Sequence, residues 1–117
     1  MPAPLRLEIL KKRADFLRAQ AGEKAGVAAF LLARGRAPNG LAVARVGFTV
    51  TRKIGKAVLR NRIRRRLREA ARQVFPDHAA SGYDYVVIAR PGAATRDFPL
   101  LLDDMKRALL RLAAHPT

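Results

Sequence analysis

The sequence predicts a small α+β domain, built as a two-layer sandwich in which helices cover one sheet. Three observations predict it. The chain has 117 residues, which is the usual length of a single domain, and half of these residues are hydrophobic. Alternating apolar patterns typical of strands occur beside patterns with helical spacing. The order of these patterns is helix, strands, helix, strand, helix. We therefore expect residues 1–117 to form one domain.

The first half of the chain predicts a short helix followed by strands. Residues 10–20 carry apolar side chains at helical spacing, and Gly22 follows as a stop signal. Residues 27–33 and 43–51 are typical of strands. Alternation predicts a core face with Phe30, Leu32, Val46, Phe48 and Val50. It predicts an opposite face with Leu31, Ala33, Gly47, Thr49 and Thr51.

The second half predicts two helices separated by a strand. Residues 57–74 have a helical apolar stripe, and Pro76 is expected to end this helix because the residue before a proline is pushed out of helical geometry. Residues 83–89 are typical of a buried strand. Residues 97–113 form the last predicted helix, with Asp97 as its N-cap.

Positive charge is concentrated in the middle of the chain. Lys and Arg number 24 against nine Asp and Glu, which gives a net charge of +15. Residues 27–75 hold 13 of these bases and a single acid, Glu69. A charge that served only solubility would be spread over the whole surface. The concentration predicts a surface that binds a polyanion, with nucleic acid as the first candidate and an anionic membrane as the second.

Six of the nine residues at positions 60–68 are arginine. Arg60, Arg64 and Arg68 recur at a spacing that places them in one row of a helix, where like charges repel. A phosphate backbone would relieve this repulsion, and the planar guanidinium suits phosphate. Two other interpretations stay open. One is a solvated helix face, although such faces normally mix signs. The other is a helix lying on anionic lipid, although its apolar stripe is needed to cover the sheet.

Several classes of protein are excluded or disfavoured. The chain has no cysteine, which excludes disulfides and cysteine-based zinc sites. It has no long apolar run and no secretory signal pattern, so we expect a cytoplasmic protein without a membrane partner. His78 and His115 are isolated, and Asp103 and Asp104 point apart on a helix. We therefore expect no catalytic residue and no metal ligand in the protein itself.

The segment at positions 47–69, GFTVTRKIGKAVLRNRIRRRLRE, resembles the bacterial ribonuclease P protein family. Its Arg-Asn-Arg at positions 60–62 resembles the motif that defines the family. The segments at positions 13–16 and 84–91 resemble the flanks of that motif. The resemblance extends over nearly the whole chain.

The resemblance implies a fold, a partner and a substrate. The implied order is α-β-β-β-α-β-α, with a left-handed β-α-β crossover that runs against the general rule. The implied partner is the catalytic RNA subunit of ribonuclease P, and the substrate is precursor tRNA, cut to release its 5′ leader. In such an endoribonuclease the RNA subunit catalyses cleavage with bound Mg²⁺. The protein docks on that RNA and holds the leader.

The resemblance also assigns roles to residues. Those expected to bind RNA are Arg52, Lys53, Lys56, Arg60, Asn61, Arg62, Arg64, Arg65, Arg66 and Arg68. The Asn61 amide can read a base edge or a 2′-hydroxyl, or it is simply a tolerated surface residue.

The sheet face opposite the core is a candidate groove for a single strand. The residues expected to bind the leader are Phe16, Leu31, Ala33 and Thr49. Phe16 either stacks a base as a side wall or belongs to the core, and the sequence leaves both open. Many relatives carry aromatic residues where this chain has Gln20 and Ala33. We therefore expect weaker stacking here and more contact through charge.

Two other functions share the size and charge of this chain. A ribosomal structural protein would bind ribosomal RNA. A DNA-binding protein could place the arginine helix in a major groove, but the sequence shows no dimer seam, and we expect no DNA partner.

Overall fold

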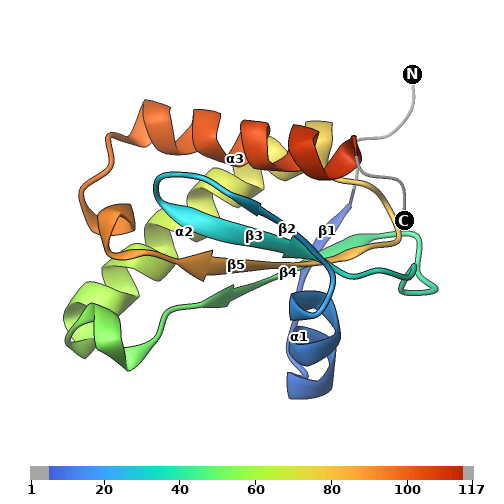
Figure 1. Cartoon of the computed structure of the whole chain (residues 1–117), viewed down its shortest axis with the longest axis horizontal. Coiled ribbons are helices and arrows are strands. Elements are labelled where there is room, and N and C mark those ends of the chain that lie inside the picture. Colours follow the sequence, from blue (N-terminus) through green and yellow to red (C-terminus); the bar gives the residue numbers. More distant parts are fainter. Residues whose placement is uncertain (1–5, 115–117) are drawn as a thin grey trace.

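A computed structural model describes residues 6–114, which form one five-stranded sheet with helices on both faces (Figure 1). The strands are β1 (Leu7–Ile9), β2 (Glu23–Gly26), β3 (Phe30–Arg34), β4 (Ala44–Thr49) and β5 (Asp84–Ala89). The helices are α1 (Arg13–Gln20), α2 (Ala57–His78) and α3 (Phe98–Ala113). Two 3-10 turns, η1 (Arg52–Ile54) and η2 (Pro91–Ala94), precede α2 and α3 respectively.

The strands lie in the order β1-β4-β5-β3-β2. β4 is parallel to both β1 and β5, whereas β3 is antiparallel to β5 and β2. α2 joins the adjacent parallel strands β4 and β5 and passes behind the sheet in Figure 1, which makes the crossover left-handed. The predicted order is confirmed from α1 onward, and β1 precedes it.

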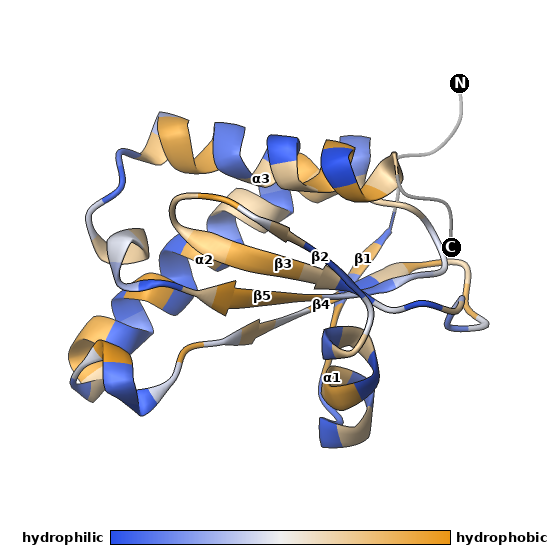
Figure 2. Cartoon of the chain, viewed as in Figure 1, coloured by the Kyte–Doolittle hydropathy of each residue, from blue (hydrophilic) through white to orange (hydrophobic). Residues whose placement is uncertain are grey.

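α2 and α3 cover one face of the sheet, and α1 covers part of the other, as a third layer added to the predicted two. Figure 2 shows hydrophobic residues along β3 and β5 and a mixture of hydrophobic and hydrophilic residues along α2 and α3. Ile63, Leu67 and Leu109 are among the helix side chains buried there. All the residues of the predicted core face belong to this core: Phe30, Leu32, Val46 and Val50 are buried in it, and Phe48 packs against it.

Two predicted boundaries in the first half are wrong. The helix predicted for residues 10–20 begins only at Arg13, because the N–H of Leu10 bonds to the Val46 carbonyl (2.9 Å) beside β1. The strand predicted for residues 27–33 begins only at Phe30. Residues 27–29 form the connection of the β2–β3 hairpin, closed by a bond from Val27 N to Phe30 O (3.0 Å). The apolar run reflected burial of this turn rather than one strand.

The predicted end of α2 is also wrong, because the helix continues through Pro76 to His78. Phe75 is fully buried, and its ring packs edge-on against Tyr85 at 5.1 Å between centroids. This burial holds the last turn in place despite the proline. At α3, Asp97 occupies the predicted N-cap position, but its side chain makes no capping hydrogen bond.

Candidate RNA interface

The outer face of α2 carries a cluster of positively charged arginines. Ile63, Leu67 and Ala70 turn inward and are fully buried. The helical period therefore turns the residues between them toward solvent. The predicted RNA-binding residues of this helix that lie exposed are Asn61, Arg62, Arg65 and Arg68, while Arg60 and Arg64 are half-buried.

The basic surface continues beyond the start of α2. Arg52, Lys53 and Lys56 are exposed in η1 and in the turn that follows it. Gly55 has a φ of 153°, a conformation that other residues rarely adopt, and a β-carbon there would meet Leu59. The Arg60 Nε donates to the Gly55 carbonyl (3.1 Å) and fixes this turn against the helix. The backbone of this junction therefore has a defined conformation, which positions the side chains of Arg52, Lys53 and Lys56.

A shallow concavity lies on α2 among these arginines. It is lined by Val58, Asn61, Arg64, Arg65 and Arg68. The Arg64 Nη1 donates to the Asn61 Oδ1 (3.3 Å), which leaves the Asn61 amide N–H groups free to donate elsewhere. Guanidinium and amide donors that converge on one hollow suit a phosphate or a 2′-hydroxyl.

Arg66 differs from its neighbours. Its guanidinium donates to the backbone carbonyls of Ala93 (3.1 Å) and Arg96, and it lies over the ring of Phe98 at 5.9 Å. It therefore ties α2 to η2 and the start of α3. These contacts give Arg66 a role in the stability of the fold, and its expected RNA contact stays a prediction.

The second expected surface lies on the face of the sheet that carries α1. The strand register aligns Leu31, Ile88 and Thr49 in one row across β3, β5 and β4. All three are half-buried. Phe16 of α1 stands over Gly47, where a β-carbon would lie 2.3 Å from two of its ring carbons. We call this row together with Phe16 the sheet groove, after the groove expected from the sequence.

The groove differs in one residue from the expected set. Ala33 is fully buried, so its side chain offers no surface to a leader. Phe16 is half-buried and packs against a small second cluster around Leu10, Ala19 and Val86. This packing supports the core interpretation of Phe16, while base stacking on its ring stays a prediction. The amide of Gln20, the last residue of α1, donates to the Thr49 hydroxyl (3.3 Å), so a polar pair lies beside the groove.

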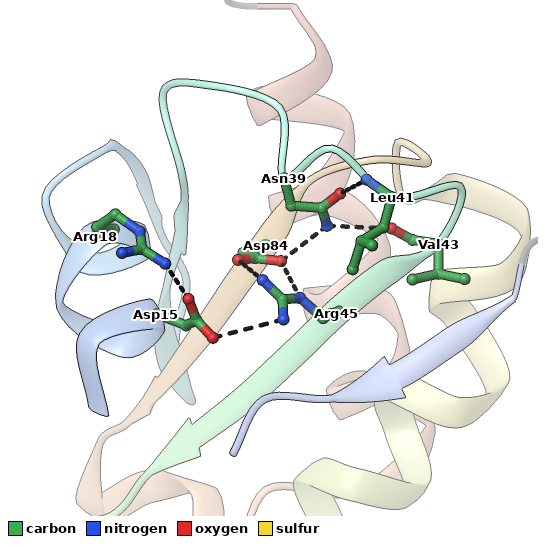
Figure 3. Close-up of polar contacts among 7 residues, drawn as sticks. All are labelled: Asp15, Arg18, Asn39, Leu41, Val43, Arg45 and Asp84. Carbon is green, nitrogen blue, oxygen red and sulfur yellow. Dashed lines mark hydrogen bonds and ion pairs between the residues drawn. The ribbon is translucent and has the colours of Figure 1, made fainter. Parts of the chain in front are cut away.

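An ion-pair network holds α1 on the sheet (Figure 3). The guanidinium of Arg45 donates to both oxygens of Asp84 (2.8 and 2.7 Å) and lies 3.5 Å from Asp15 of α1. Asp15 also pairs with Arg18, and Asp84 accepts from the Asn39 amide (2.9 Å). The hydrogen bond with Asp84 is the main cause that raises the pKa of Arg45. Sequence reasoning missed this network, and the polar Arg45 inside a strand was its only signal.

The acidic side chains largely serve such internal pairs. Asp104 is fully buried between Arg96 (3.0 Å) and Arg107 (2.8 Å), and Asp103 pairs with Arg107 (3.2 Å). Within residues 6–114, no three His, Asp or Glu side chains gather as metal ligands. His78 lies at the end of α2, and His115 lies outside the described residues. In the same part of the chain, none of the helices is both long and apolar enough to span a membrane.

Comparison with known proteins identifies relatives of this chain. The family model described as Ribonuclease P matches residues 5–113. The ribonuclease P protein component of Caulobacter vibrioides (strain NA1000 / CB15N) is 54% identical over 114 residues, covering 97% of this chain and 76% of that protein. The one from Paramagnetospirillum magneticum is 50% identical over 113 residues, covering 93% of this chain and 85% of that protein.

Solved structures show the same fold. The RNase P protein of Staphylococcus aureus superposes with a TM-score of 0.71 at 29% identity, covering 93% of this chain and 97% of that chain. The RNase P protein from Thermotoga maritima superposes with a TM-score of 0.70 at 31% identity, covering 84% of this chain and 94% of that chain.

Proposed function

Since the chain belongs to the ribonuclease P protein family, we propose that it binds the catalytic RNA subunit of ribonuclease P and the 5′ leader of precursor tRNA. Family membership gives the chain a role in tRNA 5′ processing as the RNA-binding protein subunit of a ribonucleoprotein. We further propose which surface of the protein contacts the RNA subunit and which contacts the leader. It places the protein in the cytoplasm, with the RNA that it serves.

One observation carries the proposal: the exposed face of α2 and the junction before it hold arginines and lysines with few acids among them. On α2 only Glu69 and Asp77 are acidic. When an arginine or lysine neutralises a phosphate, condensed counterions are released from the RNA. This release supplies affinity that does not depend on the RNA sequence. Arginine forks then fix the register of the protein on the RNA backbone. We propose this surface as the dock for the RNA subunit.

The sheet groove is the proposed binding site of the 5′ leader. Leu31, Ile88 and Thr49 give it a mostly apolar floor, and Phe16 offers an aromatic edge on which a base can stack. Stacking tolerates any base, which suits leaders of different sequence. Thr49 ends β4 only three residues before the basic residues Arg52 and Lys53 of η1, so a single strand in the groove would keep phosphate contacts.

The Mg²⁺ of the reaction would be held mainly by RNA. The donor set of the protein does not fit a magnesium site, because its buried carboxylates are engaged by arginines. Phosphate oxygens of the RNA subunit and substrate are the alternative hard ligands. The side chains of this chain would then bind and orient RNA, and the RNA subunit would carry out cleavage.

Reconstitution tests the proposal. Purified protein, free of RNA, is incubated with precursor tRNA and Mg²⁺, alone and with the matching RNA subunit. We expect no cleavage without the RNA subunit. With it, we expect cleavage at the 5′ end of the mature tRNA at lower Mg²⁺ than the RNA subunit needs alone. Cleavage by RNA-free protein, or no effect of the protein on the RNA subunit, would contradict the proposal.

A further inference from the structure

A second hollow lies on the other face of the sheet, between the edge strand β1 and α2. Its floor is apolar and comes from β1 and β4, while its rim comes from α2. We call it the edge pocket. It is lined by Leu7, Ile9, Phe48, Arg68, Arg72 and Pro76.

The apolar floor is open because β1 is short and lies at the edge of the sheet. Ile9 pairs with Val46, whose side chain is buried in the core beneath the helices, so both point to the helix side. The two helices leave Ile9 45% exposed. Phe48 packs only partly against the core. A flat apolar group placed here would remove this surface from water.

The rim of the edge pocket is positively charged. Arg68 and Arg72 are one helical turn apart and both are exposed. Arg72 is held by Glu69 (2.5 Å). Arg68 makes no hydrogen bond or ion pair with another described residue, so its guanidinium is available to a ligand. Arg68 also lines the concavity on α2, which joins the two hollows into one surface.

We propose that the edge pocket binds one unstacked nucleotide of the RNA subunit, with its base on Ile9 and Phe48 and its phosphate on Arg68. This inference rests on the proposed function. An apolar floor beside an unpaired guanidinium matches a nucleotide, which joins a flat base to an anion. The leader is not the source, because the sheet groove lies on the opposite face and a bound leader would have to turn around β1.

Site-specific cross-linking tests this placement. The chain has no cysteine, so Ile9→Cys creates a single attachment point for a photoactivated cross-linker. Leu110→Cys is the matched control, because Leu110 is 49% exposed on α3. Each labelled protein is assembled with the RNA subunit and with labelled precursor tRNA. We expect the label at position 9 to join one or two unpaired nucleotides of the RNA subunit, and the label at position 110 to give no such product.

Affinity provides the second readout. Ile9→Ser should weaken binding to the RNA subunit by about three- to tenfold at every salt concentration, since an apolar contact with a base releases no counterion. Leu110→Ser should leave binding unchanged. Cross-links from position 9 to the leader alone, or none above the control, would overturn the inference. So would unaltered affinity of Ile9→Ser. These results leave the proposed function standing if the wild-type protein binds the RNA subunit tightly, whereas failure of that binding would overturn both.

Discussion

The ring of Phe16 lies against the backbone of Gly47, so closely that a β-carbon at position 47 would approach two ring carbons to 2.3 Å. Phe16 can therefore approach β4 this closely only because position 47 has no side chain. This contact sets the height of the wall above the floor formed by Leu31, Ile88 and Thr49. A glycine that reads as part of a strand in the sequence thus shapes the proposed leader site.

Gly47→Ala should displace Phe16 and weaken the selection of precursor over mature tRNA. The added methyl group must push the ring or α1 outward, and overpacking of this kind costs about 1–3 kcal/mol of stability. The measurement is precursor affinity relative to mature-tRNA affinity in the assembled holoenzyme, together with a thermal melt. Gly35→Ala is the control, because its nearest contacts would be ordinary ones at 3.8 Å. Equal behaviour of the two variants would contradict the role of the contact.

Phe16→Ala should lower leader-dependent affinity by roughly 1–3 kcal/mol, the usual value for loss of one base–aromatic stack. Leu17→Ala on the same helix is the control, since Leu17 is 52% exposed. Circular dichroism must first show that Phe16→Ala is folded, because this side chain also packs on the small cluster around Val86. A folded variant with an unchanged preference for precursor would show that the leader does not lie in the sheet groove.

Arg45→Met should loosen α1 without removing any residue of the groove. It leaves Asp84 and Asp15 half-paired near the sheet, and loss of one partner from a largely buried pair costs on the order of 2–4 kcal/mol. We expect a lower melting temperature and faster amide exchange in α1 than in α2. Arg18→Met is the control, because the Arg18 side chain is mostly exposed. Uniform destabilisation with no excess exchange in α1 would contradict this assignment.

The sequence predicted the arginine face well and the network around Arg45 not at all. Helical periodicity alone separates Ile63 and Leu67 from the arginines between them, so an exposed basic face follows from spacing. Arg45 lies 30 positions from Asp15 and 39 from Asp84. The parallel pairing of β4 with β5 brings Arg45 beside Asp84, and the packing of α1 on the sheet brings Asp15 to Arg45. No local pattern encodes such a contact.

Local patterns missed β1 and β2 for a related reason, although the resemblance implied a third strand before α2. β1 has three residues, which is too short for alternation to register. β2 begins with the exposed residues Glu23 and Lys24, whose polarity hides the strand. Arg66 shows the converse, since it looks like its neighbours in sequence but points to η2 rather than to solvent.

Arg65 and Arg66 should therefore respond differently to the same change. Arg65→Gln should weaken binding of the RNA subunit and reduce the log–log salt slope by about one unit, as expected for one lost phosphate contact. Arg66→Gln should instead lower the free energy of unfolding by about 1–3 kcal/mol, because two backbone carbonyls lose a charged donor. Salt-dependent binding and urea denaturation of both variants check this. If the Arg66→Gln variant is as stable as the wild type and shows a reduced salt slope, Arg66 contacts RNA after all.

Glu69→Gln should strengthen binding to the RNA subunit, because Glu69 now holds Arg72. The hydrogen bond from Arg72 is the main cause that lowers the pKa of Glu69 to about 2. A lowered pKa means that the pairing persists above the ordinary carboxyl pKa and weakens only as the pH falls toward 2. Binding assays at neutral pH therefore always compete with this pair. The neutral glutamine keeps the shape and frees the charge of Arg72 for phosphate.

We expect an affinity gain of about two- to fivefold at low salt that shrinks as salt screens the added contact. Glu23→Gln is the matched control, since it makes the same change of net charge on β2, at the opposite edge of the sheet from β1. A gain for Glu69→Gln alone would place Arg72 at the interface. An equal gain for both variants would mean that net charge, rather than release of Arg72, governs the effect.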